Sequence, residues 1–223
     1  MDRILRGSDG WQEAVGRALT TATRPIAADE RFAPRAANTA SGLPRYDRAT
    51  FPPARPAATL LLLYPSLDGE LTVPLTLRHA DLRSHAGEIS LPGGAADPAD
   101  ASLEATAVRE AHEEIDVEPS SVTILGTLDD LWIPVSNFEL RPFVGASAVR
   151  PSMTPQTEEV TEIVELPVRQ LLADGAILDE LIEGPGWQLR AAVYRYAGHR
   201  IWGATARTLA MFAAVLVEAD LGA

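Results

Sequence analysis

The chain has 223 residues, a formal net charge of −12 at pH 7, 46% hydrophobic residues and no cysteine. The lack of cysteine excludes disulfides, thiolate catalysis and cysteine-ligated zinc. The negative charge argues against a nucleic-acid partner, which needs a basic surface, but not against a small nucleotide whose charge a cation and a few arginines neutralise. No stretch approaches the length of an apolar transmembrane helix, so we expect a cytoplasmic protein with no membrane partner.

The first elements in chain order are a helix and a long connection. Residues 8–22 predict a helix, because their apolar residues recur at helical spacing, at Trp11, Val15, Ala18 and Leu19. Residues 23–58 are rich in Pro, Ala and Arg and have no period, which predicts an extended surface connection. We therefore divide the chain into an N-terminal helix with a Pro/Ala/Arg-rich extension, residues 1–56, and a globular domain, residues 57–223.

A hairpin and a glycine-rich turn come next. The apolar run 59–64 and the stretch 70–78 predict two paired strands. Residues 88–91 predict a short strand that leads to Gly93 and Gly94. Glycine has no side chain, so the backbone can approach a metal or a phosphate closely at these two positions.

The remaining elements alternate between helix and strand. A helix capped by Asp100 or Ser102 ends near Ile115. The loop 129–138 joins the predicted strands that precede and follow this loop. The predicted strands are 122–128, 139–146, 160–166 and 187–196, and the predicted later helices are 168–172 and 205–218. This order predicts an α/β fold, an α/β/α sandwich with a mixed sheet.

Three carboxylates on the helix before Ile115 indicate a metal site. Glu110, Glu113 and Glu114 lie at i, i+3 and i+4, so a helix places them on one face, where like charges repel. A divalent cation reverses that repulsion, and Mg²⁺ binds through one or two carboxylates together with substrate phosphates. The alternative is a solvated helix face on which Arg109 pairs with Glu113.

The same helix resembles the Nudix box in its second half, on Arg109, Glu110, Ala111, Glu113, Glu114 and Val117. This resemblance implies a Nudix-type fold and the hydrolysis of a nucleoside diphosphate derivative with Mg²⁺ or Mn²⁺ as cofactor. A second likeness, to the coenzyme A pyrophosphatase branch of the family, lies upstream at Arg78, Arg83, Gly87, Pro92, Gly93 and Gly94. It implies cleavage of coenzyme A or its derivatives into 3',5'-ADP and (acyl-)4'-phosphopantetheine.

The resemblance also implies a role for each matching residue. Glu110 and Glu114 would be the principal metal ligands, Glu113 a third ligand or the partner of Arg109, and Arg109 the residue that orients the carboxylates. A glutamate of the acidic loop 154–162 would complete the metal site or act on the water, and of Glu158, Glu159 and Glu162 we choose Glu159. The residues that would bind substrate are Arg78, Arg83, His85, Gly93 and Gly94.

Two departures from the pattern keep other functions open. Asp116 stands where the box has Gly, and Ala101 stands where an early Glu is expected. The alternatives are a Nudix hydrolase for ADP-ribose, NADH or a dinucleoside polyphosphate, and a Nudix-fold binding module without activity. The resemblance leaves a homodimer open. Trp132 and Phe138 are either core residues or a wall for adenine or pantetheine.

Overall fold

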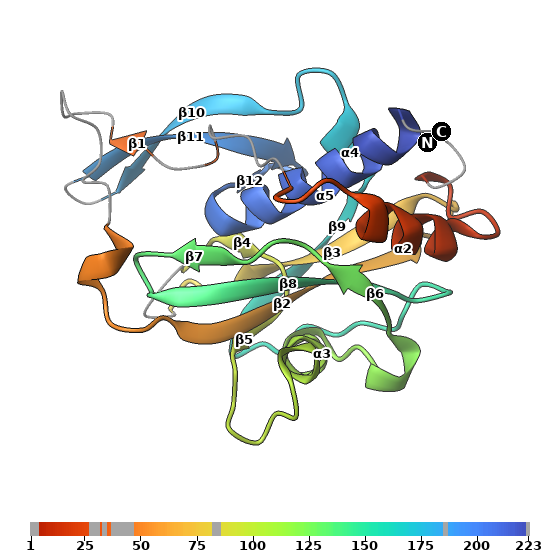
Figure 1. The fold of residues 1–223 in the computed structure, drawn as a ribbon, viewed down its shortest axis with the longest axis horizontal. Helices are drawn as coiled ribbons and strands as arrows, with labels where there is room; N and C mark the ends of the chain where they lie inside the picture. The colour runs from red at the N-terminus through yellow and green to blue at the C-terminus, as the bar shows by residue number, and fades with distance from the viewer. Residues whose placement is uncertain are drawn as a thin grey trace.

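The computed structural model describes residues 5–26, 32, 35–36, 47–81, 86–184 and 187–221. Its main sheet has the order β4-β3-β2-β8-β6, with β5 and β7 added on β2 and β8 and with β9 on β3 (Figure 1). The strands are β2 (Arg55–Pro65), β3 (Leu71–Arg78), β4 (Ile89–Ser90), β5 (Gly93–Ala95), β6 (Thr123–Thr127), β7 (Leu131–Ile133), β8 (Phe138–Ala146) and β9 (Val160–Pro167). Strands β2 and β8 are parallel and the other pairs are antiparallel, so the sheet is mixed, as predicted.

Helices cover both faces of this sheet. Helix α3 (Leu103–Ile115) lies on one face, and α2 (Trp11–Thr21) and α5 (Gly203–Leu221) lie on the other (Figure 1). The predicted α/β/α arrangement is therefore confirmed. The shorter helices are η2 (Arg48–Thr50), η3 (Pro119–Ser121) and α4 (Arg169–Leu172). None of the helices in the described part of the chain is long and apolar enough to cross a membrane.

Strand β2 lies between two apolar cores. Leu61 and Leu63 pack in the core beneath α2 and α5, whereas Leu60, Leu62 and Tyr64 pack in the core beneath α3. Successive side chains of a strand point to opposite faces, so a strand that is buried on both faces needs an unbroken apolar run. The sequence of five apolar residues that predicted this strand is therefore explained by its central position.

A second, smaller sheet was not predicted. It contains β10 (Leu178–Gly184), β11 (Trp187–Tyr196), β12 (His199–Ile201) and β1 (Arg35–Ala36). Strand β10 carries acidic residues that hide its strand character, and these pair with arginines of β11: Asp179 with Arg190 at 3.1 Å and Glu180 with Arg195 at 2.6 Å. Such cross-strand ion pairs stabilise a strand whose composition is unfavourable.

Two connections are more ordered than predicted. The predicted loop 129–138 contains β7, whose Leu131 pairs with Leu140 of β8. The predicted connection 23–58 contains the turn η2 and ends inside β2, which begins at Arg55. Strand β7 is held by its pairing with β8, whereas η2 is capped locally by Asp47, whose side chain accepts a hydrogen bond from the Ala49 N–H.

Candidate active site

Helix α3 is held at both ends as its sequence suggests. The Ser102 hydroxyl accepts a hydrogen bond from the Ala105 backbone N–H at 3.1 Å, so Ser102 rather than Asp100 is the cap. The helix ends at Asp116 in a left-handed conformation with φ 58°, which Asp tolerates better than most residues. The substitution of Asp for the usual Gly is thus compatible with the same helix end.

Glu114 is a buried carboxylate, because the apolar side of α3 packs onto β2 and carries it inward. Only 3% of the residue is exposed, and its Oε1 lies 3.5 Å from Nη1 of Arg78, the last residue of β3. Oε2 has no hydrogen-bond partner in the structure. The pKa of Glu114 is raised to about 8, mainly by burial; Arg78 opposes the rise, while Glu110 and Glu159 contribute to it.

Glu110 lies one turn earlier on the same side of α3. Burial raises the pKa of its carboxyl, against the opposing charge of Arg109, and the nearby Glu113 and Glu159 add to the rise. The backbone of Gly94 runs directly against this carboxylate, since a Cβ on Gly94 would come within 2.6 Å of its oxygens. Only glycine therefore fits at position 94 without moving Glu110.

Arg109 is the centre of a hydrogen-bonded cluster. It donates to both carboxylate oxygens of Asp100, from Nε at 2.9 Å and from Nη2 at 3.0 Å. Its Nη1 lies 2.9 Å from Glu110 Oε1 and 2.7 Å from Glu113 Oε2. The hydrogen bonds from Arg109 hold the pKa of Asp100 well below its usual range. Its Nη2 also donates to the Ala95 carbonyl at 3.3 Å, so each of its N–H groups faces a group of the protein itself.

The three helix glutamates are not equivalent. The Glu113 side chain is 56% exposed and pairs with Arg109 at i, i+4, which is the solvated arrangement given as the alternative for the whole set. Glu110 is half-buried and Glu114 is buried, and the charge of Glu110 raises the pKa of Glu114. The structure therefore brings together the principal pair and separates the third residue from it.

Glu159 reaches the same region from the loop before β9. Its backbone N–H donates to Gln156 at 3.0 Å, and its carbonyl accepts from the His79 N–H at 2.7 Å. The Gln156 N–H in turn donates to the Glu114 carbonyl at 2.9 Å, one of the carbonyls left open at the end of a helix. The loop is thereby fixed to α3 and β3, and the charge of Glu159 raises the pKa of both Glu110 and Glu114.

The donors fit a hard divalent cation. Within the described residues, no three acidic or histidine side chains gather around one point. Mg²⁺ does not need such a cage, since it binds through one or two carboxylates and takes further oxygens from substrate phosphates and water. Two neighbouring carboxylates, one with a buried oxygen that lacks a partner, are the donor set that this mode of binding needs.

The remaining predicted residues divide into described and undescribed ones. Arg78 faces Glu114, and Gly93 lies close enough for its backbone N–H to favour the charged form of that carboxyl. Arg83 and His85 lie outside the described residues. Asp100, which the sequence analysis names as a candidate cap, belongs to the hydrogen-bonded cluster around Arg109. Its position in the acidic loop nine residues before Arg109 is the signal for its role.

Trp132 and Phe138 are covered by side chains of the chain itself. The Phe51 ring meets Trp132 edge-on at 5.1 Å between ring centroids, and Arg48 lies over the same ring at 5.7 Å. Arg55 lies over Phe138 at 4.2 Å from the ring centroid. Both rings therefore pack against the segment that precedes or begins β2.

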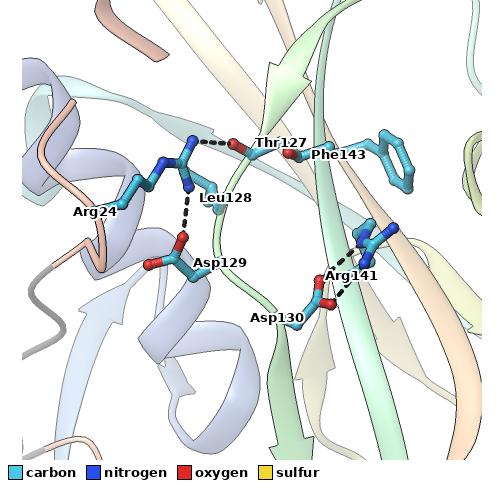
Figure 2. Close-up of a pocket in the computed structure, with 7 residues that line it drawn as sticks. All are labelled: Arg24, Thr127, Leu128, Asp129, Asp130, Arg141 and Phe143. Carbon is cyan, nitrogen blue, oxygen red and sulfur yellow. Dashed lines mark hydrogen bonds and ion pairs between the residues drawn. The ribbon is translucent and has the colours of Figure 1, made fainter. Parts of the chain in front are cut away.

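Figure 2 shows an open pocket beside the bend between β6 and β7. Its two arginines are already neutralised, Arg24 by Asp129 at 2.6 Å and Arg141 by Asp130 at 2.7 Å. The pocket contains none of the residues predicted to act in the site. We therefore assign it no part in the chemistry, and the carboxylates of α3 remain the candidate active site.

Comparisons with known proteins identify the family to which the chain belongs. Residues 54–182 match the NUDIX domain family. A protein of Pectobacterium atrosepticum described as "Uncharacterized Nudix hydrolase NudL" is 40% identical over 60% of this chain and 70% of its own length. A protein of Photorhabdus laumondii with the same description is 39% identical over 60% of this chain and 72% of its own.

A crystal structure of the Nudix hydrolase RenU from M. smegmatis is similar with a TM-score of 0.45 and 24% sequence identity, covering 55% of this chain and 76% of that one. The family match covers more than half of the chain and includes β5, α3 and Glu159. The protein belongs to the Nudix hydrolase family, whose members act on nucleoside diphosphate derivatives.

Proposed function

We propose that the protein hydrolyses the diphosphate bond of coenzyme A or its derivatives, giving 3',5'-ADP and (acyl-)4'-phosphopantetheine. The observation that carries the proposal is the half-buried Glu110 one turn before the buried Glu114, which has an unpartnered oxygen and lies next to Arg78. The match of Arg78, Arg83, Gly87, Pro92, Gly93 and Gly94 to the coenzyme A branch supports the choice of substrate. Nudix hydrolases generally use divalent cations, and Mg²⁺ or Mn²⁺ suits these oxygen donors.

Diphosphate hydrolysis needs charge neutralisation on phosphate oxygens and a water in line with the leaving group. Glu110 and Glu114 would hold the cation, which when bound supplies Lewis-acid neutralisation of the charge on the diphosphate. Gly94 keeps the backbone close to the Glu110 carboxylate. Arg109 and Asp100 keep that carboxylate in one orientation.

Glu159 is our choice for the group that takes the proton from the attacking water. The water oxygen forms a bond to phosphorus as the bridging P–O bond breaks, and the electron pair of that bond leaves on the second phosphate. The hydrogen bonds of the Glu159 backbone to Gln156 and His79 fix the position of its Cα atom, from which the side chain extends. Its charge acts on both Glu110 and Glu114, which supports a position within reach of the same substrate.

Arg78, with Arg83 and His85, would bind the phosphates of coenzyme A, which carries a 3'-phosphate as well as the diphosphate. Arginine suits this role because its planar guanidinium matches phosphate oxygens with two parallel hydrogen bonds. Gly93 would add a backbone contact.

Product analysis by mass spectrometry tests the proposal. Wild-type protein with Mg²⁺ or Mn²⁺ should convert coenzyme A to 3',5'-ADP and 4'-phosphopantetheine, and Glu114→Gln should not. ADP-ribose, NADH and a dinucleoside polyphosphate serve as competing substrates in the same assay. If one of these is turned over faster than coenzyme A, that compound would be assigned as the substrate instead. If no diphosphate is turned over, a binding module would be favoured. The homodimer stays a prediction, which light scattering would check.

A further inference from the structure

We propose that Arg78 is the resident counter-ion of Glu114, that it competes with the divalent cation for this carboxylate, and that cation binding releases its guanidinium to the diphosphate. The inference rests on the proposed function, since it concerns the same carboxylates. It assigns to Arg78 a role in metal affinity that neither the family match nor the sequence pattern contains.

The contact between the two residues is incomplete. Arg78 Nη1 and Glu114 Oε1 are 3.5 Å apart, whereas a charge-assisted hydrogen bond between such groups is about 2.7–2.9 Å long. The Arg109–Asp100 pair in the same site has that short, two-pronged geometry, at 2.9 and 3.0 Å. Arg78 therefore neutralises Glu114 at a distance without being locked onto it.

Both partners also keep a buried polar atom without a hydrogen-bond partner. These atoms are Arg78 Nε and Glu114 Oε2, and the Glu114 side chain is 4% exposed. Leaving such atoms unpaired costs free energy, and a fully satisfied pair would be expected if the contact served the fold alone. Arg78 Nε could donate a hydrogen bond to a phosphate oxygen, and Glu114 Oε2 could bind a cation.

Because Arg78 and the cation are both positively charged, Glu114 pairs with one or the other. Glu114 has Glu110 and Glu159 as negative neighbours, and Arg78 is its one ion-pair partner among the described residues. A buried, ionised carboxylate without a nearby positive charge is strongly destabilised, so Arg78 stabilises the ionised form of Glu114 when no cation is present. A cation at Glu110 and Glu114 would neutralise the Glu114 carboxylate in place of Arg78 and would repel the guanidinium. The guanidinium would then be free to bind phosphate.

The test compares Mg²⁺ binding with substrate binding in substitutions of Arg78. Calorimetry of substrate-free protein, at one fixed alkaline pH for every variant, gives the Mg²⁺ affinity. Arg78→Gln should bind Mg²⁺ on the order of tenfold more tightly, because a like charge next to the cation has been removed. The same variant should raise the KM for coenzyme A on the order of tenfold, because a phosphate ligand is lost. Its melting temperature in chelator should fall.

Arg150→Gln is the matched control, because Arg150 also forms an ion pair, with Glu165 at 2.8 Å. It should leave the Mg²⁺ affinity and the KM unchanged. Arg78→Met, which keeps the length of the apolar stem, gives the same expectations if the Gln variant does not fold. Equal or weaker Mg²⁺ binding in the folded Arg78 variants would overturn the competition and leave a purely structural ion pair.

The failure of this inference differs from a failure of the proposed function. Glu114→Gln should weaken Mg²⁺ binding under the same conditions. Wild-type Mg²⁺ affinity in that variant would overturn the metal site itself. Weakened binding in Glu114→Gln together with unchanged binding in both Arg78 variants would overturn only the role of Arg78.

Discussion

Two arginines serve the same helix in opposite ways. Arg109 forms short contacts with Asp100, with the half-buried Glu110 and with the exposed Glu113. Arg78 lies 3.5 Å from Glu114 on the buried side, where an atom of each residue lacks a partner. One cluster is complete without a ligand and the other is incomplete. This difference is the basis of our proposal that the Arg109 cluster positions carboxylates and that the Arg78 side receives cation and substrate.

The largest expected effect is that of Glu114→Gln on turnover. Loss of a principal metal ligand should lower kcat for coenzyme A on the order of a thousandfold, while the fold is kept because Gln has the same shape. Kinetics and circular dichroism measure the two quantities. The control is Glu104→Gln, an exposed position in the first turn of the same helix, which should match wild type. Turnover like that of wild type in Glu114→Gln would remove Glu114 from the chemistry.

Asp100→Asn should have a smaller effect, because Asp100 acts through Arg109. The variant loses a charge-assisted pair of hydrogen bonds, so Glu110 is less firmly oriented. We expect kcat to fall roughly ten- to a hundredfold with little change in KM. Steady-state kinetics measure both, and a rise of KM alone would place Asp100 in substrate binding instead.

The burial of Glu114 should also make the stability of the metal-free protein depend on pH. The pKa of Glu114 is about 8 in the folded protein and 4.5 ordinarily. Between these values the folded state keeps a proton that the unfolded state has lost, so stability falls as pH rises from about 4.5 to about 8. One such proton corresponds to at most about 1.4 kcal/mol per pH unit.

Urea unfolding in chelator, at several pH values, measures this slope. Other groups also titrate in this range, so the informative quantity is the difference between wild type and Glu114→Gln. The variant should lack the fall that Glu114 contributes. The same slope in both proteins would show that Glu114 is ionised in the folded state throughout the range.

Much of the fold was predictable because it follows from local patterns. The apolar run of β2 and the helical spacing of Trp11, Val15 and Leu19 depend on burial periodicity alone, and both elements are present. Strand β10 was missed because its acidic residues are stabilised by arginines of β11. That pairing exists only after the chain has folded.

In the site, too, local patterns predicted some features, whereas others depend on contacts formed only in the folded chain. Spacing on a helix predicted that Glu110, Glu113 and Glu114 share a side, but not that Glu113 is exposed and Glu114 buried. Depth depends on how α3 packs onto β2 and on the loop that meets its end. The contact between Arg78 and Glu114 joins positions far apart in the sequence, so no local pattern contains it.

Glu113→Gln should have the smallest effect of the substitutions on α3. Its side chain is 56% exposed and bonded to Arg109, and exposed ion pairs contribute about 0–1 kcal/mol. We expect a change of roughly a fewfold or less in kcat and in Mg²⁺ affinity. Calorimetry and kinetics alongside Glu114→Gln would show it; an equal loss in the two variants would contradict the division of α3 into two sides.

The most direct measurement is anomalous diffraction from crystals soaked in Mn²⁺. Our account predicts an anomalous peak within coordination distance of the carboxylates of both Glu110 and Glu114, with the Arg78 guanidinium turned away from Glu114. A peak elsewhere, or none in crystals of protein that is active with Mn²⁺, would contradict it.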